Sequence, residues 1–269
     1  MDKNLRYLDA TAINSIINEA QDQLALDTEI LERITGLRVT AGVNRVTPPA
    51  DMIRPTKFVY RDYWNMGPTN IVEFTEQMGF YGPFSSWPFK WEVFEGDILL
   101  NPSPSETSPA TTINDAGGIS ASDTSVTVAD AAAFPVNGIF VVENETIEYF
   151  NRSGNVLNNL RRGIGGSVAA THADTTALTL CLLRMAYFAR FKTLSADADV
   201  SEVPDRYIHV LVDQAAVIAF NAGGESAMSE RHRGLYEAAT RQIKAVAQQK
   251  QRERPDRVLS IDRNSRLWM

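Results

Sequence analysis

The sequence predicts an α+β protein, in which a helical-bundle domain is interrupted by a small all-β module. Three observations support this fold class. Apolar residues recur at three- and four-residue steps near the N-terminus and again after residue 203. Residues 107–178 are instead rich in Val, Ile, Thr and Phe, with Gly, Asn and Asp between the runs. The stretch SPSETSPATT that leads into this block has the composition of a linker.

The composition excludes several classes of protein. The chain has 269 residues and 44% hydrophobic residues, which is enough to build a core. Its one cysteine, Cys181, excludes an intramolecular disulfide and a cysteine-rich metal site. A folded chain without disulfides fits a reducing compartment, such as a bacterial or host cytoplasm. We see no signal peptide and no run of about 20 apolar residues, so we expect no membrane span.

The first half of the chain predicts one helix followed by strands. Residues 9–35 carry an amphipathic stripe, and Gly36 is a plausible stop. Residues 37–105 are dense in aromatics, glycine and proline, and short alternating runs at 58–60 and 91–94 indicate strands. These rings either form a binding surface or pack an irregular segment onto the helices.

The second half predicts two long helices and a tail. Residues 180–195 are apolar and fit a strand or a helix. Helical patterns then cover 203–223 and 226–253, and Pro255 stops the second helix. The predicted domains are 1–106 (first part of the helical domain), 107–179 (inserted β module), 180–254 (C-terminal helices) and 255–269 (extended tail).

The glycine-rich segment RRGIGGSVAATHAD (161–174) raises the question of a phosphate site. No lysine follows its glycines, as a P-loop requires, and a dinucleotide fingerprint would need a third glycine at another step. We therefore predict a β-turn segment whose glycines adopt positive φ, and whose His172 bonds locally.

Catalytic and metal motifs are missing from the sequence. His172, His209 and His232 lie far apart, without HxxxH or HExxH spacing, and there is no GxSxG elbow. The stretch SADADVSE lacks the glycine and terminal glutamate of a calcium loop. We expect no catalytic residue, no metal and no cofactor, and hence no enzyme.

Charge is spread unevenly along the chain. The net charge is −7, but residues 229–269 carry ten Lys or Arg and five Asp or Glu. This basic arm either faces DNA phosphates non-specifically, faces the acidic body of a neighbouring subunit, or is a solvated helix of mixed charge. The basic residues concerned are Arg241, Lys244, Lys250, Arg252 and Arg254.

Several weak motifs together resemble a known family. They are the N-terminal helix, WEVFEGDILLNPSP (91–104) and LRMAYFARFKTLSADADVSEVPDRYIHVLVDQAAVIAF (183–220). The positions that carry the pattern are Trp91, Ile98 to Pro102, Tyr187, Leu194-Ser195, Asp199, Pro204 and Tyr207. The order resembles the head–tail adaptor (connector) proteins of tailed bacteriophages over residues 5–105 and 180–269. The segment R-G-x-x-G-S-x-A-x-x-H (162–172) also resembles β modules of phage tail and connector proteins, although simple adaptors lack such an insertion.

The resemblance implies a structural protein of the virion, assembled in the host cytoplasm and located at the head–tail junction. It implies a homo-oligomeric ring of twelve copies that contacts the portal ring and a downstream tail or neck protein. Packaged DNA would pass through this ring during genome ejection, without specific contacts. The resemblance also implies that the C-terminal tail reaches the portal. Its candidate portal-binding residues are Val258, Leu259, Ile261, Arg263, Leu267, Trp268 and Met269.

Two other functions stay open at this point. One is a tail or baseplate component whose β module and aromatic residues bind carbohydrate. The other is a tail-associated hydrolase, which a pocket with strongly shifted carboxylates would favour.

Overall fold

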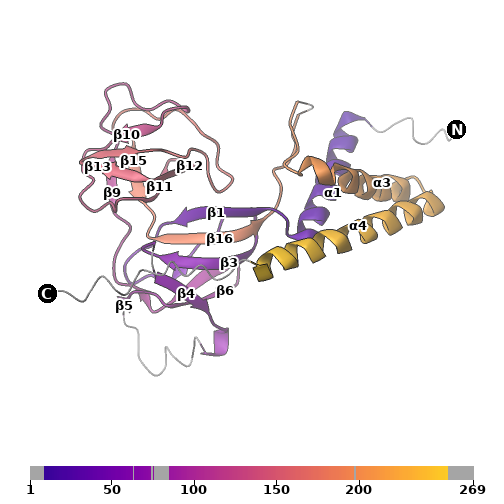
Figure 1. The fold of residues 1–269 in the computed structure, drawn as a ribbon, viewed down its shortest axis with the longest axis horizontal. Coiled ribbons are helices and arrows are strands. Elements are labelled where there is room, and N and C mark those ends of the chain that lie inside the picture. Colours follow the sequence, from indigo (N-terminus) through magenta and orange to yellow (C-terminus); the bar gives the residue numbers. More distant parts are fainter. Residues whose placement is uncertain (1–8, 63, 74, 76–84, 197, 254–269) are drawn as a thin grey trace. The chain divides into compact units, whose positions relative to one another are not determined.

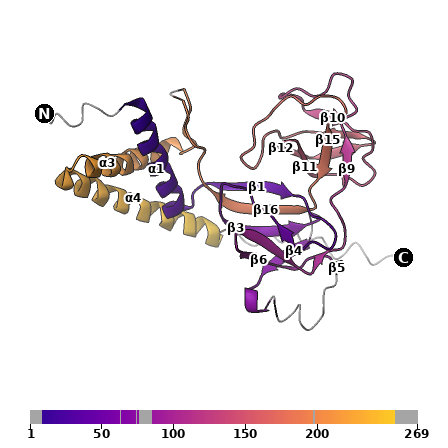
Figure 2. The same ribbon diagram turned by 180° about the vertical axis from the view of Figure 1, so that it is seen from behind.

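The computed structural model describes residues 9–62, 64–73, 75, 85–196 and 198–253. The chain divides into two compact units, one made of residues 1–30 and 190–269 and the other of residues 31–189. Figures 1 and 2 show them from opposite sides. The named elements of the first unit are helices, and those of the second are strands.

The described residues of the helical unit form three long helices and one short 3-10 helix. They are α1 (Ala10–Thr28), η2 (Asp205–Tyr207), α3 (Ile208–Ala222) and α4 (Ser226–Glu253). α1 begins where the Asp9 carboxylate accepts a hydrogen bond of 2.7 Å from the Ala12 N–H, which satisfies a free donor at the helix start. α3 and α4 are adjacent in sequence and joined through Gly224, whose φ is +75°. The helices predicted over 203–223 and 226–253 are confirmed.

The predicted helix over 9–35 is too long. α1 ends at Thr28, Glu29 takes the left-handed conformation with φ +50°, and the chain then enters a strand, β1 (Glu32–Leu37). Gly36 lies inside this strand rather than at a helix stop. A Cβ on Gly36 would lie 2.6 Å from Cys181 Cβ and 2.6 Å from Ile139 Cγ2, so glycine is needed here for close packing.

The largest sheet of the β unit has seven strands. Its order is β1, β16 (Leu183–Ala189), β3 (Met52–Tyr60), β4 (Trp64–Pro68), β6 (Lys90–Phe94), β7 (Asp97–Asn101) and β2 (Arg45–Val46). All neighbours are antiparallel except β4 and β6. The strands predicted at 58–60 and 91–94 are confirmed, and the ambiguous stretch 180–195 supplies β16 between β1 and β3. A separate parallel pair joins β5 (Ser85–Ser86) to β8 (Ser103–Pro104).

Two smaller sheets fill residues 110–180. One has the order β12 (Glu145–Tyr149), β11 (Gly138–Val142), β15 (Ala177–Leu180) and β9 (Ala110–Thr112). The other has the order β10 (Ser125–Thr127), β14 (Val156–Asn158) and β13 (Asn151–Ser153). A continuous core joins these sheets to the large one, since Phe58 and Tyr187 belong to the same buried cluster as Phe140 and Tyr149. The β unit therefore folds around shared apolar contacts.

The predicted fold class is wrong. The described chain is mostly β, with several sheets and few helices, and is not a helical bundle with a small β insertion. The prediction failed because residues 37–105 were assigned to the helical domain, whereas their short aromatic runs pair with β16 and β1 in one sheet. Local patterns indicate single strands, but they do not show which distant strands pair in one sheet. The domain boundaries at 106, 179 and 254 stay predictions.

Candidate functional site

The glycine-rich segment surrounds a buried carboxylate, Glu145 on β12. The Arg162 guanidinium donates to both carboxylate oxygens, with Nε 2.8 Å from Oε1 and Nη2 2.8 Å from Oε2. The backbone N–H groups of Gly163 and Ala170 donate to the same carboxylate at 3.0 Å each. His172 Nε2 lies 2.7 Å from Oε2. A side chain that is 1% exposed is thus surrounded by hydrogen-bond donors.

These donors set the charge state of Glu145. Burial raises its pKa, but the hydrogen bonds from Arg162, His172 and the Ala170 N–H outweigh burial and lower the pKa to about 2. A carboxylate with so low a pKa is ionised at neutral pH and is a weak base, so it is poorly suited to general acid–base catalysis. A hydrolase would need a carboxyl group whose pKa is raised toward neutral pH. The pKa of Glu145 is lowered instead, as expected for a carboxylate that stabilises the fold.

The side chains beside Glu145 also contact other protein groups. His172 Nδ1 lies 2.8 Å from Glu143 Oε2, so both ring nitrogens face carboxylates. Arg162 Nη1 donates to the Ser120 carbonyl, and Nη2 donates to the Ala170 carbonyl at 2.6 Å. Each guanidinium nitrogen of Arg162 therefore bonds to the protein. We infer that this cluster, which we call the Glu145 cluster (Glu143, Glu145, Arg162 and His172), holds the loop in place.

The glycines bring the same loop against the large sheet. Gly163, Gly165 and Gly166 have φ of +62°, +64° and +81°, which confirms the predicted positive φ. A Cβ on Gly165 would lie 2.7 Å from Thr35 Cβ on β1. The Tyr187 hydroxyl on β16 lies 3.2 Å from the Gly165 carbonyl and donates to it. His172, in contrast, bonds to residues 27 and 29 positions earlier, so its predicted local bonding is wrong.

The other two histidines, His209 and His232, lie on α3 and α4. Within the described residues, no group of three or more His, Cys, Asp or Glu is placed to hold a metal ion. His232 Nδ1 lies 2.9 Å from Asp213 Oδ1, and its ring stacks on Phe220 with centroids 5.6 Å apart. This histidine thus helps to join α4 to α3.

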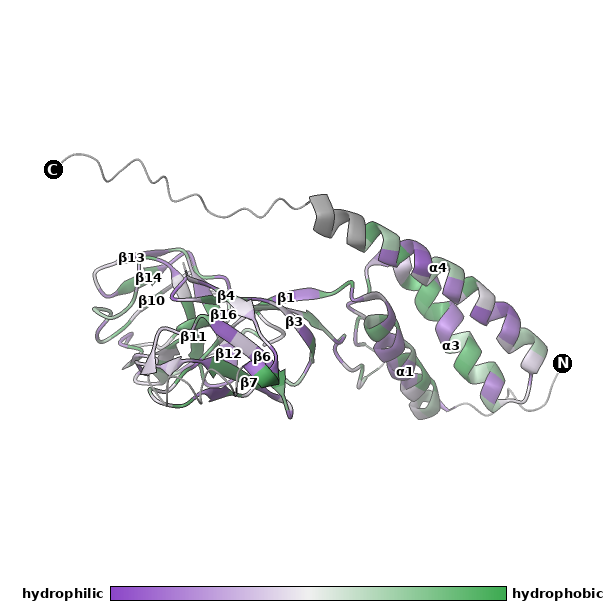
Figure 3. Ribbon diagram, turned by 90° about the horizontal axis from the view of Figure 1, so that it is seen from below, coloured by the Kyte–Doolittle hydropathy of each residue, from purple (hydrophilic) through white to green (hydrophobic). Residues whose placement is uncertain are grey.

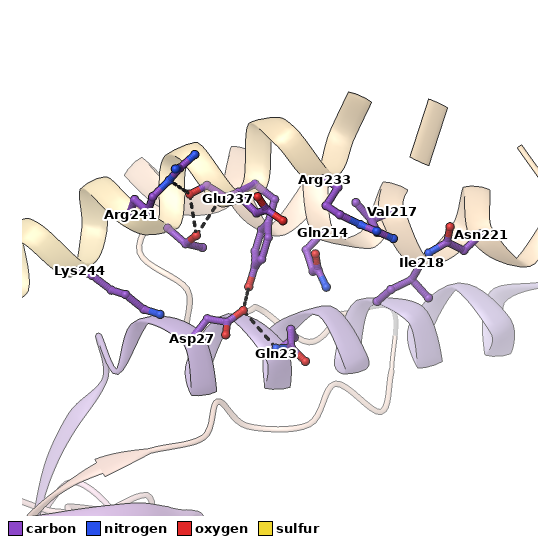
Figure 4. Close-up of a pocket in the computed structure, with 12 residues that line it drawn as sticks. Gln23, Asp27, Gln214, Val217, Ile218, Asn221, Arg233, Glu237, Arg241 and Lys244 are labelled. Carbon is purple, nitrogen blue, oxygen red and sulfur yellow. Dashed lines mark hydrogen bonds between the residues drawn. The ribbon is translucent and has the colours of Figure 1, made fainter. Parts of the chain in front are cut away.

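A groove of about 580 Å³ lies between α1, α3 and α4 (Figure 4). Tyr236 donates its hydroxyl proton to Asp27 Oδ2 at 2.7 Å, and Gln23 Nε2 donates to the same oxygen at 3.1 Å. Burial and the bond to Asp27 both raise the pKa of Tyr236, so its hydroxyl stays a donor. Figure 4 shows Lys244 extending from α4 toward α1. The groove is therefore polar and of mixed charge, and hydrogen bonds between its lining residues join α4 to α1.

The predicted basic residues fall into three groups. Arg241 and Lys244 line the groove. Lys250 and Arg252 belong to α4, but their side chains lie outside the described residues. Arg254 and the candidate portal-binding residues Val258, Leu259, Ile261, Arg263, Leu267, Trp268 and Met269 also lie outside the described residues. Whether the basic residues face DNA or a neighbouring subunit stays a prediction.

The opposite side of the helical hairpin carries exposed apolar side chains. Val212 on α3 is 57% exposed, and Leu235 and Val246 on α4 are 51% and 46% exposed. Met228, Leu235 and Val246 recur at steps of seven and eleven residues, which places them on one side of α4. We call Val212, Met228, Leu235 and Val246 the apolar flank. Figure 3 shows hydrophobic positions along α3 and alternating hydrophobic and hydrophilic positions along α4.

The α3–α4 hairpin that carries this flank lies within a segment that matches a known family. Residues 181–259 match the model of a family described as SU10 adaptor protein. The matched region contains β16, η2, α3 and α4 and is less than a third of the chain. A search of the curated proteins found no match. Similarity to a phage adaptor family supports a structural protein that associates with other virion proteins.

Sequence reasoning missed the two features that organise these surfaces. It did not find Glu145, although an acidic residue in the run ETIEY, beside Thr and Ile, is an available signal for a buried partner of Arg162. The helical pattern over 226–253 also did not distinguish Ile243, which is buried, from Leu235 and Val246, which are exposed. No helix in the described residues is long and apolar enough to cross a membrane.

Proposed function

We propose that this chain is a head–tail adaptor of a tailed bacteriophage, a structural virion protein that forms a ring between the portal and the tail. The observation that carries the proposal is the similarity of residues 181–259 to the SU10 adaptor family. The ring completes the channel through which DNA leaves the head. The protein acts by binding its neighbours and performs no catalysis.

Two physical features support this proposal. The helices inside the matched region expose large apolar side chains, and exposed apolar surface of this kind marks interaction sites. The Glu145 cluster, whose carboxylate has a strongly lowered pKa, holds a loop in place through its hydrogen bonds. The buried charges of the Glu145 cluster thus stabilise the fold, and the exposed apolar flank is available for association.

The proposed partners follow from the position between head and tail. Twelve copies form the ring, the portal ring lies on one side, and a tail or neck protein lies on the other. Residues 255–269 reach the portal, because an extended segment with Val258, Leu259, Leu267 and Trp268 can add a strand to an exposed edge. The basic residues of α4 contact passing DNA without sequence preference or contact the next subunit.

Electron microscopy of the purified chain mixed with the portal ring of the same phage tests the proposal. We expect an added ring of fixed subunit number below the portal. A chain that lacks residues 255–269 is expected to keep its circular dichroism spectrum and to lose portal binding. Free portal beside the folded, unassociated chain would contradict the adaptor function and favour a tail or baseplate component. Unchanged binding by the truncated chain would remove the proposed role of the tail alone.

A further inference from the structure

The apolar flank lies on the side of α4 that its own α1 does not use. Arg233, Tyr236, Glu237, Thr240, Arg241 and Lys244 line the groove beside α1. At 100° per residue, Met228, Leu235 and Val246 point to the other side of α4. Among the described residues of the helical unit the flank is therefore left exposed, as the exposures of Val212, Leu235 and Val246 also indicate.

The outward face of α1 has a complementary composition. The inner face of α1 buries Ala20, Leu24, Ala25 and Thr28. The same helical geometry turns Glu19, Asp22 and Leu26 outward, and Leu26 is 44% exposed. Two acidic residues, Glu19 and Asp22, lie on this face, and residues 9–29 contain no Lys or Arg. The outer face of α1 is thus acidic with an apolar residue at its C-terminal end.

The apolar flank is bordered by a cation. Arg231 is exposed and lies between Met228 and Leu235 along α4. Asp213 on α3 and His232 on α4 contact each other, with Asp213 Oδ1 2.9 Å from His232 Nδ1. On the α1 side, Asp22 meets Arg190 at 3.4 Å, with both side chains about half exposed, while Glu19 is exposed. An exposed pair of this kind is weak and leaves the acidic face attractive to a cation.

We propose that the apolar flank of one copy packs against the outward face of α1 of the next copy. Leu26 enters the space beside Val212 and Leu235, and Glu19 pairs with Arg231. The two surfaces differ, so the contact is heterologous and repeats from copy to copy, which is the kind of contact that closes a ring. This inference rests on the proposed adaptor function, because it names the surfaces through which that ring forms.

Cysteine cross-linking on the portal-bound ring tests the contact. A chain with Leu26→Cys and Leu235→Cys carries one thiol on each of the two side chains that the proposal brings together. The matched control has Leu26→Cys and Glu237→Cys, which moves the second thiol to the groove side of α4. The natural Cys181 does not interfere, because it is buried and burial raises its pKa to about 12.

The expected result is a ladder of covalently linked multimers from the flank pair. It should form about tenfold faster than any product of the groove pair, because neighbouring thiols have a high effective concentration. A portal-bound ring that gives no ladder with the flank pair overturns this contact and leaves the adaptor function standing. Failure of the unmodified chain to form a ring overturns the adaptor function, and the contact with it.

Charge reversal gives an independent measurement on the same ring. Glu19→Lys and Arg231→Glu are each expected to raise the concentration needed for half-maximal ring assembly by about threefold or more. The double variant restores the pair in reversed order and should return assembly toward that of the unmodified chain. Additive losses in the double variant would show that these two residues do not meet.

Discussion

The glycine-rich loop of the β unit and the α3–α4 hairpin of the helical unit treat their conspicuous side chains in opposite ways. The β unit buries a charged cluster around Glu145 and satisfies it with an arginine, a histidine and two backbone amides. The helical unit exposes large apolar side chains at Val212, Leu235 and Val246. Buried charge that is fully paired holds a structure together, whereas exposed apolar surface awaits a partner. The most unusual sequence motif therefore marks a stabilising cluster, and the surface proposed for association has an ordinary helical sequence.

The largest effect is expected from removing the centre of the Glu145 cluster. Glu145→Ala leaves Arg162 and His172 buried without their shared carboxylate, which typically costs about 3–5 kcal/mol. Unfolding by urea, followed by tryptophan fluorescence, measures the loss, because Trp64, Trp87 and Trp91 belong to the β unit. Glu143→Ala is the control, since Glu143 is 59% exposed and makes one bond to His172. A loss for Glu145→Ala no larger than that of the control would show that the cluster does not stabilise the unit.

The second effect is the pH dependence of the stability that Glu145→Ala removes. The pKa of Glu145 is about 2 in the folded chain, against an ordinary value of 4.5. Between these values the unfolded chain binds the proton and the folded chain does not, so stability falls as the pH falls. The difference in urea midpoint between the natural chain and Glu145→Ala should be constant above about pH 4.5 and should narrow toward pH 2. A difference that is unchanged at pH 2.5 would contradict the low pKa.

The third effect separates close packing from backbone strain. Gly165→Ala places a Cβ at 2.7 Å from Thr35 at a φ of +64°, and is expected to cost about 2–4 kcal/mol. Gly154→Ala is matched in φ, at +57°, but its Cβ meets nothing within 4 Å, so only strain of about 1–2 kcal/mol remains. The same urea titration measures both. Equal losses would mean that the glycine loop does not press against β1.

The sequence predicted some of these features and missed others for physical reasons. Helices α3 and α4 and the positive φ of the loop glycines follow from local patterns, namely a periodic apolar stripe and glycine itself. The pairing of β16 with β1 and β3 is non-local, so the large sheet was not foreseen. The contact between Glu145 and Arg162 spans 17 residues and depends on how a loop returns to a strand. The exposure of Leu235 depends on which side of α4 faces α1, and the stripe alone does not fix that side.

The smallest effect tests whether the apolar flank lacks a partner in the free chain. Leu235→Ala removes a side chain that is 51% exposed, and should change the free energy of unfolding of the helical unit by no more than about 0.5 kcal/mol. Ile243→Ala, eight residues later on the same helix, removes a side chain that is 5% exposed and should cost about 2–4 kcal/mol. Thermal unfolding followed by circular dichroism at the helical band compares the two. A loss above about 1 kcal/mol for Leu235→Ala in the free chain would mean that the flank is already covered, and the contact with a second copy would lose its basis.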